Sequence, residues 1–394
     1  MSPERNPFTP GAGYAPPYLA GRETVLHTFE RHIDRASRLP KHFLLTGLRG
    51  TGKTVLLREF QEICARAGWV CARRELDETA ADTGVLLRMV AADLARVAAG
   101  ASLGVRLRQV GREVVEALKP KDIQAWGVRY SPAYAKVLET PDRDQLVALL
   151  HQVLAVLRHD HTGLVLMYDE FHEVWDGRYR GQAPLATLLG AIKEVQLASQ
   201  PVVLVACGLP PLLPQLLKSR SYLERDIAVQ RIDNLAAADA AAAITRPLAT
   251  TSVRFSPRLV DEIVRGTRGY PFFLQHYCSF LLDSAPDCRE FDLSIYDLLR
   301  PLLLEGLDES FFLGRFTKLP PAERALLFAI ACAGERVRLT DIPWAGPRNV
   351  LRTLAGRLVE RGHLYRPSQR GEVAFALPLY REFLLRYESG RAGA

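Results

Sequence analysis

The feature that most constrains the fold of this chain is a glycine-rich loop between an apolar run and a helix-like segment. Residues 43–60 read FLLTGLRGTGKTVLLREF, and within them residues 47–54 match the pattern GxxxxGK[ST] in full. Glycines let backbone N–H groups close around phosphate oxygens, and the N-terminus of the following helix favours their negative charge. The pattern therefore predicts a strand, a phosphate-binding loop and a helix, in that order.

The polar residues of this loop have predicted roles with Mg²⁺ and ATP. Lys53 would reach the β and γ phosphates, and the Thr54 hydroxyl would ligate Mg²⁺. A chance glycine turn before a helix is the alternative, and the flanking strand and helix argue against it. The predicted nucleotide-binding residues of the loop are Gly47, Leu48, Arg49, Gly50, Thr51, Gly52, Lys53 and Thr54.

A second apolar run ends in two acidic residues. LVLMYDE places Asp169 and Glu170 at the end of a predicted strand. A loop of this kind needs a second magnesium contact from a neighbouring strand, which Asp169 would supply, while Glu170 would polarise the attacking water as general base. A strand ending in Asp-Glu is common, so the prediction depends on its pairing with the loop. We expect His172 and Glu173, which complete DEFHE, to have surface or supporting roles rather than to bind a metal.

Composition and length indicate a globular protein of two or three domains. Of 394 residues, 48% are hydrophobic and 24% charged, which argues against disordered and fibrous classes. No apolar run approaches the roughly 20 residues of a membrane helix, and the first residues lack the signal-peptide pattern, so we expect a cytoplasmic protein without membrane contact. Six scattered cysteines without a CxxC pair argue against structural zinc and a disulfide framework.

Alternation of helix-like and strand-like segments predicts an α/β fold. Short apolar runs bounded by turns are typical of strands buried on both faces, and helical segments between them imply a parallel sheet covered on both sides. A helix from Gly21 should bury Val25, Phe29 and Ile33. The predicted strands besides the one before the loop are 69–76, 163–171 and 201–209, with a helix at 185–199 and mostly helical sequence over 78–160, interrupted near 119–132.

The remainder of the chain reads differently. Helices are predicted near 236–249, 257–265, 271–283 and 293–305, and from Phe316 three helices precede a hairpin over 362–377. That order suits a winged helix-turn-helix.

In this order the segments resemble those of AAA+ ATPases, most closely the branch that groups replication-initiator-like and STAND-class ATPases. The resemblance covers roughly residues 14 to 385, and besides the loop and LVLMYDE it rests on residues 18–33, 202–216, 221–235 and 266–277. It implies an α/β P-loop NTPase fold, with a parallel AAA+ sheet, a helical lid and a C-terminal winged helix-turn-helix. The implied domains are an arm at 1–20, a nucleotide-binding domain at 21–235, the lid at 236–315 and the winged-helix domain at 316–394.

The resemblance also implies further nucleotide contacts. The arm and LAGRE, with Leu19, Gly21 and Arg22, would lie along the adenine, and Pro271 of GYP would pack near the base and report nucleotide state to the lid. An ordinary turn before a helix is the alternative for GYP.

Two departures from the family pattern affect catalysis. The strand at 201–209 ends in ACGLPP, so a polar residue that would orient water is missing there, unless Cys207 substitutes weakly. The lid offers GYP instead of an arginine directed at the phosphate, with Arg268 adjacent. A catalytic arginine from a neighbouring subunit is best matched by Arg225, with Arg220 second and a plain surface arginine as the alternative. Such a residue would imply a homo-oligomer.

Nearly all of the net charge of +7 lies at the C-terminal end, where residues 316–387 hold 12 Lys or Arg against 6 Asp or Glu. Over 346–364, an apolar stripe of Val350, Leu351, Leu354, Leu358 and Val359 would leave a polar face for a DNA groove. Solvated polar faces are common, and internal packing of this domain is the alternative. The candidate DNA contacts are Arg348, Asn349, Arg352 and Arg357, with Thr353 beside them, and Arg366 and Arg370 flanking the wing tip.

These patterns predict an ATPase that couples Mg-ATP hydrolysis to conformational change and acts on double-stranded DNA, as initiators, loaders or transposition-associated ATPases do. The alternative is a switch in which ATP/ADP exchange gates assembly with a protein partner. A small-molecule kinase is a more distant option, because no second-substrate pocket is recognisable.

Overall fold

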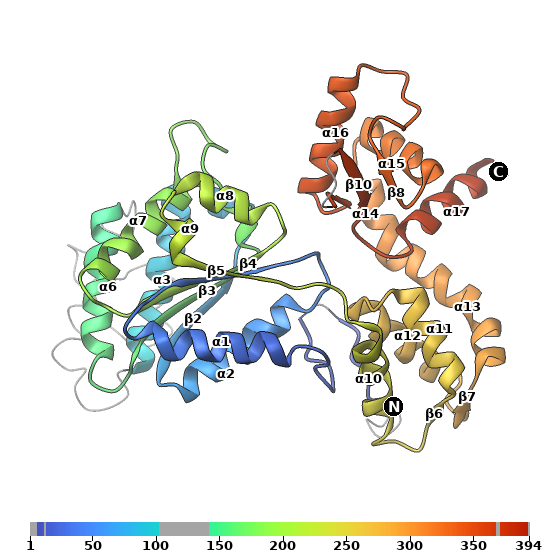
Figure 1. Ribbon diagram of the computed structural model, residues 1–394, viewed down its shortest axis with the longest axis horizontal. Coiled ribbons are helices and arrows are strands. Elements are labelled where there is room, and N and C mark those ends of the chain that lie inside the picture. The colour runs from blue at the N-terminus through green and yellow to red at the C-terminus, as the bar shows by residue number, and fades with distance from the viewer. Residues whose placement is uncertain (1–5, 12, 102–141, 368–370, 393–394) are drawn as a thin grey trace, which may run out of the picture. The chain divides into compact units, whose positions relative to one another are not determined.

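The computed structural model describes residues 6–11, 13–101, 142–367 and 371–392 (Figure 1). The chain divides into two compact units. The sheet unit comprises Glu23–Gly47 and Lys53–Ile232, and the helical unit comprises Met1–Arg22, Leu48–Gly52 and Asp233–Ala394. The predicted interruption near 119–132 lies outside the described residues. None of the described helices is long and apolar enough to cross a membrane.

The sheet unit is built on five parallel strands in the order β2-β3-β4-β1-β5. The predicted parallel sheet is therefore confirmed, and β5 is an edge strand that the sequence did not indicate. The strands are β1 (His42–Thr46), β2 (Trp69–Glu75), β3 (Gly163–Asp169), β4 (Val202–Gly208) and β5 (Ile227–Arg231).

Helices cover both faces of this sheet. On β1, Phe43 makes edge contacts with Phe29 and Phe60 of α1 and α2, whereas Leu44 joins the apolar core of α3, α6 and α7. Neighbouring strand residues point to opposite faces, so the two helix groups lie on opposite sides. The helical elements are α1 (Glu23–Ala36), α2 (Lys53–Arg66), η1 (Glu78–Ala81), α3 (Thr83–Ala101), α6 (Arg143–Leu157), η3 (Phe171–Glu173), α7 (Pro184–Leu197), α8 (Leu212–Ser219) and α9 (Leu223–Asp226).

The helical unit begins with helices that match the predicted ones closely. They bury aromatic residues such as Tyr270, Phe273 and Phe312 in one continuous core. Two short strands, which the sequence did not indicate, pair in parallel. The elements are α10 (Ala237–Leu248), β6 (Arg254–Phe255), α11 (Pro257–Thr267), α12 (Pro271–Ser284), β7 (Glu290–Phe291), α13 (Leu293–Leu307), η4 (Asp308–Leu313) and α14 (Gly314–Thr317).

The C-terminal part differs from the predicted three helices followed by a hairpin. A strand and turns separate α15 from α16, and a further helix, α17, follows the hairpin. PWAGP interrupts any helix between them, because proline and glycine are poor helix residues. The elements are α15 (Pro321–Ala333), β8 (Arg336–Arg338), α16 (Arg348–Glu360), β9 (Leu364–Tyr365), β10 (Glu372–Phe375) and α17 (Tyr380–Ala392), and the antiparallel sheet has the order β8-β10-β9.

Candidate functional site

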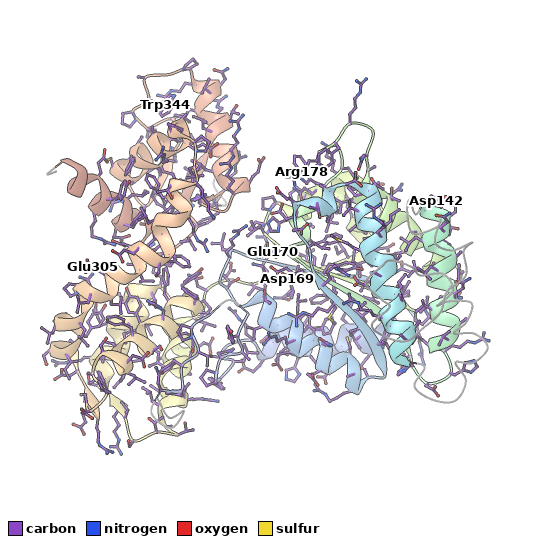
Figure 2. The ribbon with its side chains drawn as sticks, turned by 180° about the vertical axis from the view of Figure 1, so that it is seen from behind. Asp142, Asp169, Glu170, Arg178, Glu305 and Trp344 are labelled. Atoms are coloured by element: carbon purple, nitrogen blue, oxygen red, sulfur yellow. The ribbon has the colours of Figure 1, made fainter. Side chains whose placement is uncertain are left out.

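The predicted magnesium ligands lie together at the carboxyl end of the parallel sheet. The Thr54 hydroxyl, at the start of α2, donates a 2.6 Å hydrogen bond to Oδ2 of Asp169, the last residue of β3. Asp169 is buried, and Figure 2 labels it beside Glu170. Mg²⁺ takes oxygen ligands and is usually held by few protein groups together with substrate phosphates. A hydroxyl and a carboxylate in contact therefore fit this ion.

Lys53 is buried and held by a hydrogen bond, as expected of a lysine that binds phosphate. It is 5% exposed, and its Nζ donates a 3.0 Å hydrogen bond to the carbonyl of Gly47. The Gly47 amide in turn donates to the carbonyl of Gly208, at the end of β4, at 3.2 Å. The start of the loop is thereby attached to the strand that lies between β1 and β3.

Glu170 follows β3 in an unusual backbone conformation. Its φ of 51° and ψ of 31° are left-handed, and its amide donates a 2.9 Å hydrogen bond to Oδ1 of Asp169. Non-glycine residues held in this region cost on the order of 1–3 kcal/mol, and they cluster at functional sites. The conformation turns the chain directly after β3, so Asp169 and Glu170 present their carboxylates from consecutive positions.

The middle of the loop is held within the helical unit. Arg22 is 7% exposed and donates hydrogen bonds to the carbonyls of Thr51 at 2.9 Å and Asp233 at 2.8 Å. The Thr51 hydroxyl closes a turn by donating to the Leu48 carbonyl at 2.9 Å. Arg22 therefore braces the loop backbone.

Gly50 makes a close approach that no other residue type would permit. Its φ is 73°, and a Cβ on it would lie 2.0 Å from the Tyr270 hydroxyl oxygen. Tyr270 precedes Pro271, the first residue of α12, and is buried. The GYP segment therefore packs directly on the loop through its tyrosine, a contact that the sequence did not indicate.

The remaining predicted nucleotide contacts lie on the same unit. Leu19 is partly buried, and Gly21 has a φ of 62° and packs against the Asp239 side chain of α10. Arg49 is half-buried, and its Nε is shielded from water without a hydrogen-bond partner.

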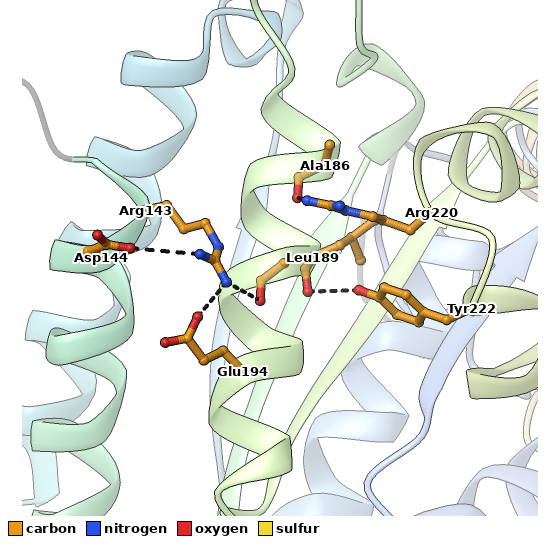
Figure 3. Close-up of polar contacts among 8 residues, drawn as sticks. Arg143, Asp144, Ala186, Leu189, Glu194, Arg220 and Tyr222 are labelled. Carbon is orange, nitrogen blue, oxygen red and sulfur yellow. Dashed lines mark hydrogen bonds and ion pairs between the residues drawn. The ribbon is translucent and has the colours of Figure 1, made fainter.

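Arg225 and Arg220, the two candidates for a catalytic arginine, have different surroundings. The Arg220 guanidinium donates to the Ala186 carbonyl of α7 at 2.6 and 3.1 Å, beside a 2.9 Å hydrogen bond from Tyr222 to Leu189 (Figure 3). Arg225 is exposed on α9. Arg220 thus has a structural position, and Arg225 is the more accessible of the two.

Cys207, near the end of β4, is the weak substitute expected for the polar residue that orients water, and its surroundings make it unsuitable. It is fully buried, and burial, followed by the charge of Asp169, raises the pKa of its thiol well above the usual value. The thiol therefore stays protonated at neutral pH. His172 is a better candidate for orienting the attacking water, because it packs against Gly208, the last residue of β4.

The candidate DNA contacts lie mainly on the exposed face of α16. Arg352, Arg357 and Asn349 are exposed, and Arg366 is exposed beyond β9. Arg348 instead caps the preceding turns by donating to the carbonyls of Leu339 and Ile342 at 3.1 and 3.2 Å. Arg370 lies outside the described residues. The predicted apolar stripe is wrong at one position, because Val350 is 42% exposed and the buried residues are Leu351, Leu354, Ala355 and Leu358.

Comparisons with known proteins agree with this geometry. Residues 18–205 match the family described as AAA ATPase domain, and residues 309–384 match a domain of unknown function, DUF8462. No curated protein sequence matches the chain significantly.

Two solved structures share the fold at low sequence identity. A Walker-type ATPase of Pyrococcus abyssi has a TM-score of 0.57 at 14% identity, covering 93% of this chain and 96% of its own. The ORC2 protein of Aeropyrum pernix, in ADPNP–ADP complexes, has a TM-score of 0.58 at 14% identity, covering 98% of both chains. Residues 18–205 are therefore similar to an AAA ATPase domain, and the chain has the AAA+ P-loop fold that these two structures share.

Proposed function

We propose that the chain binds and hydrolyses Mg-ATP and uses the cycle to change the conformation of its helical unit while acting on DNA. The observation that carries the proposal is the Thr54–Asp169 contact beside Glu170, at the end of β3 and next to the loop of Lys53. This contact supports the proposal because phosphoanhydride hydrolysis needs three groups that these residues can provide: a cation for the phosphates, a magnesium-binding pair and a carboxylate base.

Each residue has one step in the proposed reaction. Lys53 leaves the Gly47 carbonyl for the β and γ phosphates. Thr54 and Asp169 would hold Mg²⁺, which would neutralise phosphate charge. Glu170 accepts a proton from the attacking water. The loop backbone from Gly47 to Gly52 donates to the phosphate oxygens.

We propose that residues 236–315 act as a lid and residues 316–394 as a winged-helix domain. Helix, strand, helix and hairpin follow in order, and β10 pairs with both β8 and β9. The exposed arginines of α16 support contact with phosphates of duplex DNA.

A signalling switch is the second candidate, and one contact favours it. Arg268, in a left-handed conformation at the end of α11, is 2.7 Å from Glu335 and 4.0 Å from Glu382. This attachment of the lid helix to the C-terminal part would let the domain serve as an internal packing module whose release depends on nucleotide.

Glu170→Gln tests the hydrolytic role, because the amide keeps the shape of the side chain and removes the base. We expect ATP affinity to persist, measured by calorimetry, and phosphate release to fall by a factor on the order of 100 or more. Wild-type turnover in this variant would contradict the proposed chemistry. Duplex DNA, added at two salt concentrations, separates the DNA-acting ATPase from the switch.

A further inference from the structure

We propose that His172 positions Glu170 and takes the place of the polar side chain that the end of β4 lacks. The inference rests on the proposed function, in which Glu170 is the general base. It goes beyond that proposal by giving the base a supporting partner and an outer chain of ion pairs that runs through Arg178 to Glu78 of η1.

The local backbone brings His172 back towards Glu170. After the left-handed Glu170, the η3 turn closes with a hydrogen bond from the Glu173 amide to the Glu170 carbonyl at 3.0 Å. Nδ1 of His172 lies 3.3 Å from Oε2 of Glu170, and Nε2 lies 3.6 Å from Oε1 of Glu173. Each ring nitrogen therefore lies within ion-pair distance of one carboxylate. These contacts are longer than strong hydrogen bonds, as catalytic contacts often are before substrate binds.

Gly208 supplies the space for this ring. A Cβ on Gly208 would lie 3.2 Å from both the backbone nitrogen and Nδ1 of His172, and 2.9 Å from Leu212. The end of β4 therefore has no room for the polar side chain of its own, and the imidazole lies against it instead. The Gly208 carbonyl also accepts the hydrogen bond from Gly47, so the ring is one residue removed from the start of the phosphate loop.

An ion-pair chain continues outward from His172. Glu173 is 3.7 Å from Arg178, which is 3.3 Å from Glu78 of η1. Arg178, labelled in Figure 2, belongs to the loop between η3 and α7. Asp176 anchors this loop by accepting hydrogen bonds from the Leu185 amide at 2.9 Å and the Ser219 hydroxyl at 2.6 Å.

This arrangement restricts two rotations at once. With Glu173 fixed by Arg178, the imidazole has one favourable ring orientation, and with the ring fixed, Glu170 loses freedom to swing away from its water. His172 is 9% exposed, so water competes little for its nitrogens. A positioning residue of this kind changes turnover and leaves ATP affinity unaltered.

His172→Ala is the test, with His172→Gln as the conservative variant. We expect kcat of the alanine variant to fall on the order of tenfold while the ATP KM and calorimetric Kd stay unchanged. The glutamine variant retains an amide donor and should recover part of kcat. Arg178→Ala should lower kcat less, because Arg178 reaches His172 only through Glu173.

His32→Ala is the control for loss of a histidine elsewhere in the sheet unit. His32 contacts the Lys41 carbonyl at 3.0 Å on the far end of α1 and should affect melting temperature without lowering kcat. Unchanged kcat in His172→Ala, or a rise in KM without a fall in kcat, would overturn the proposal, provided Glu170→Gln is inactive. If Glu170→Gln hydrolyses ATP normally, the proposed function fails instead. If His172→Ala does not fold, kcat and KM are measured for His172→Gln instead. Unchanged kcat and KM in His172→Gln, together with a wild-type kcat in Arg178→Ala, would overturn the proposal.

Discussion

At the scale of single residues, comparing alanine variants of Gly50 and Gly52 distinguishes the cost of backbone strain from the cost of a steric clash. Both have positive φ, at 73° and 93°, but only Gly50 lies against another group, the Tyr270 hydroxyl. We expect Gly52→Ala to cost about 1–3 kcal/mol in free energy of unfolding, and Gly50→Ala to cost more. Thermal melting measures both. Adding Tyr270→Phe to Gly50→Ala should recover part of the loss, and equal losses in the two single variants would contradict the contact.

Lys53 gives a second prediction at this scale. Lys53→Ala removes the one loop cation whose Nζ is held beside the Gly47 carbonyl, and a hydrogen bond to a charged group is worth about 1.5–3 kcal/mol. We expect ATP affinity, measured by calorimetry, to fall about tenfold or more. Thermal stability without nucleotide should also fall, because the buried hydrogen bond to the Gly47 carbonyl is lost. ATP affinity equal to wild type would count against the loop assignment.

At the scale of elements, β1 carries a pH-dependent contribution to stability. His42 is fully buried at the start of this central strand, and its Nδ1 accepts the Leu204 amide at 3.3 Å. Burial lowers its pKa from 6.5 to about 4. In the unfolded chain His42 therefore binds a proton below about pH 6.5, whereas in the folded protein it stays neutral until about pH 4. The free energy of unfolding therefore falls as the pH is lowered from 6.5 to 4.

The shift corresponds to about 3 kcal/mol at most. Urea unfolding at pH 7 and pH 5 should show about 2 kcal/mol of this loss in the wild type, because pH 5 lies about 1.5 units below the unfolded pKa, and a smaller loss in His42→Leu. His363, hydrogen-bonded to Tyr380, has a pKa lowered to about 4 by burial and contributes a parallel part. An identical pH slope in His42→Leu would contradict the assignment.

Elements with local signals were predictable, and elements that depend on distant partners were not. The strand, loop and helix around Lys53 have a spacing that little else satisfies, and Asp169 ends an unbroken apolar run. The position of β4 between β1 and β3 depends on pairing across the whole sheet. The role of His172 could not be predicted either, because DEFHE does not reveal that Gly208 leaves room for its ring.

Helix α16 gives the DNA prediction at this scale. Arg352→Ala with Arg357→Ala removes two exposed charges and should flatten the salt slope of duplex binding by about 1.8, at about 0.9 for each phosphate contact. Arg348→Ala is the matched control, because Arg348 bonds two backbone carbonyls and should mainly lower the melting temperature. Gel retardation at two salt concentrations measures the slope. An unaltered slope in the double variant would favour the internal packing role.

At the scale of the whole molecule, the open question is whether one chain completes the site of another. In the proposed reaction, Lys53 would contact phosphate, Thr54 and Asp169 would hold the metal, and Glu170 would act as the base. None of them is an arginine directed at a developing phosphate charge. Arg225 is exposed on α9, where its backbone carbonyl accepts a hydrogen bond from Lys41 at 2.9 Å and its backbone amide donates one to the Tyr222 carbonyl at 3.1 Å. An exposed guanidinium is available to a neighbouring subunit.

Complementation tests this directly. Glu170→Gln subunits keep Arg225 but lack the base, and Arg225→Ala subunits keep the base but lack the arginine, so we expect each to be nearly inactive alone. Mixing them should restore part of the turnover, because interfaces form in which an intact base meets an intact arginine. Arg220→Ala is the control, since Arg220 is bound to α7 and its loss should be expressed as a lower melting temperature that mixing cannot rescue. Mixtures no more active than their components, together with turnover strictly proportional to wild-type concentration, would place the whole reaction within one chain.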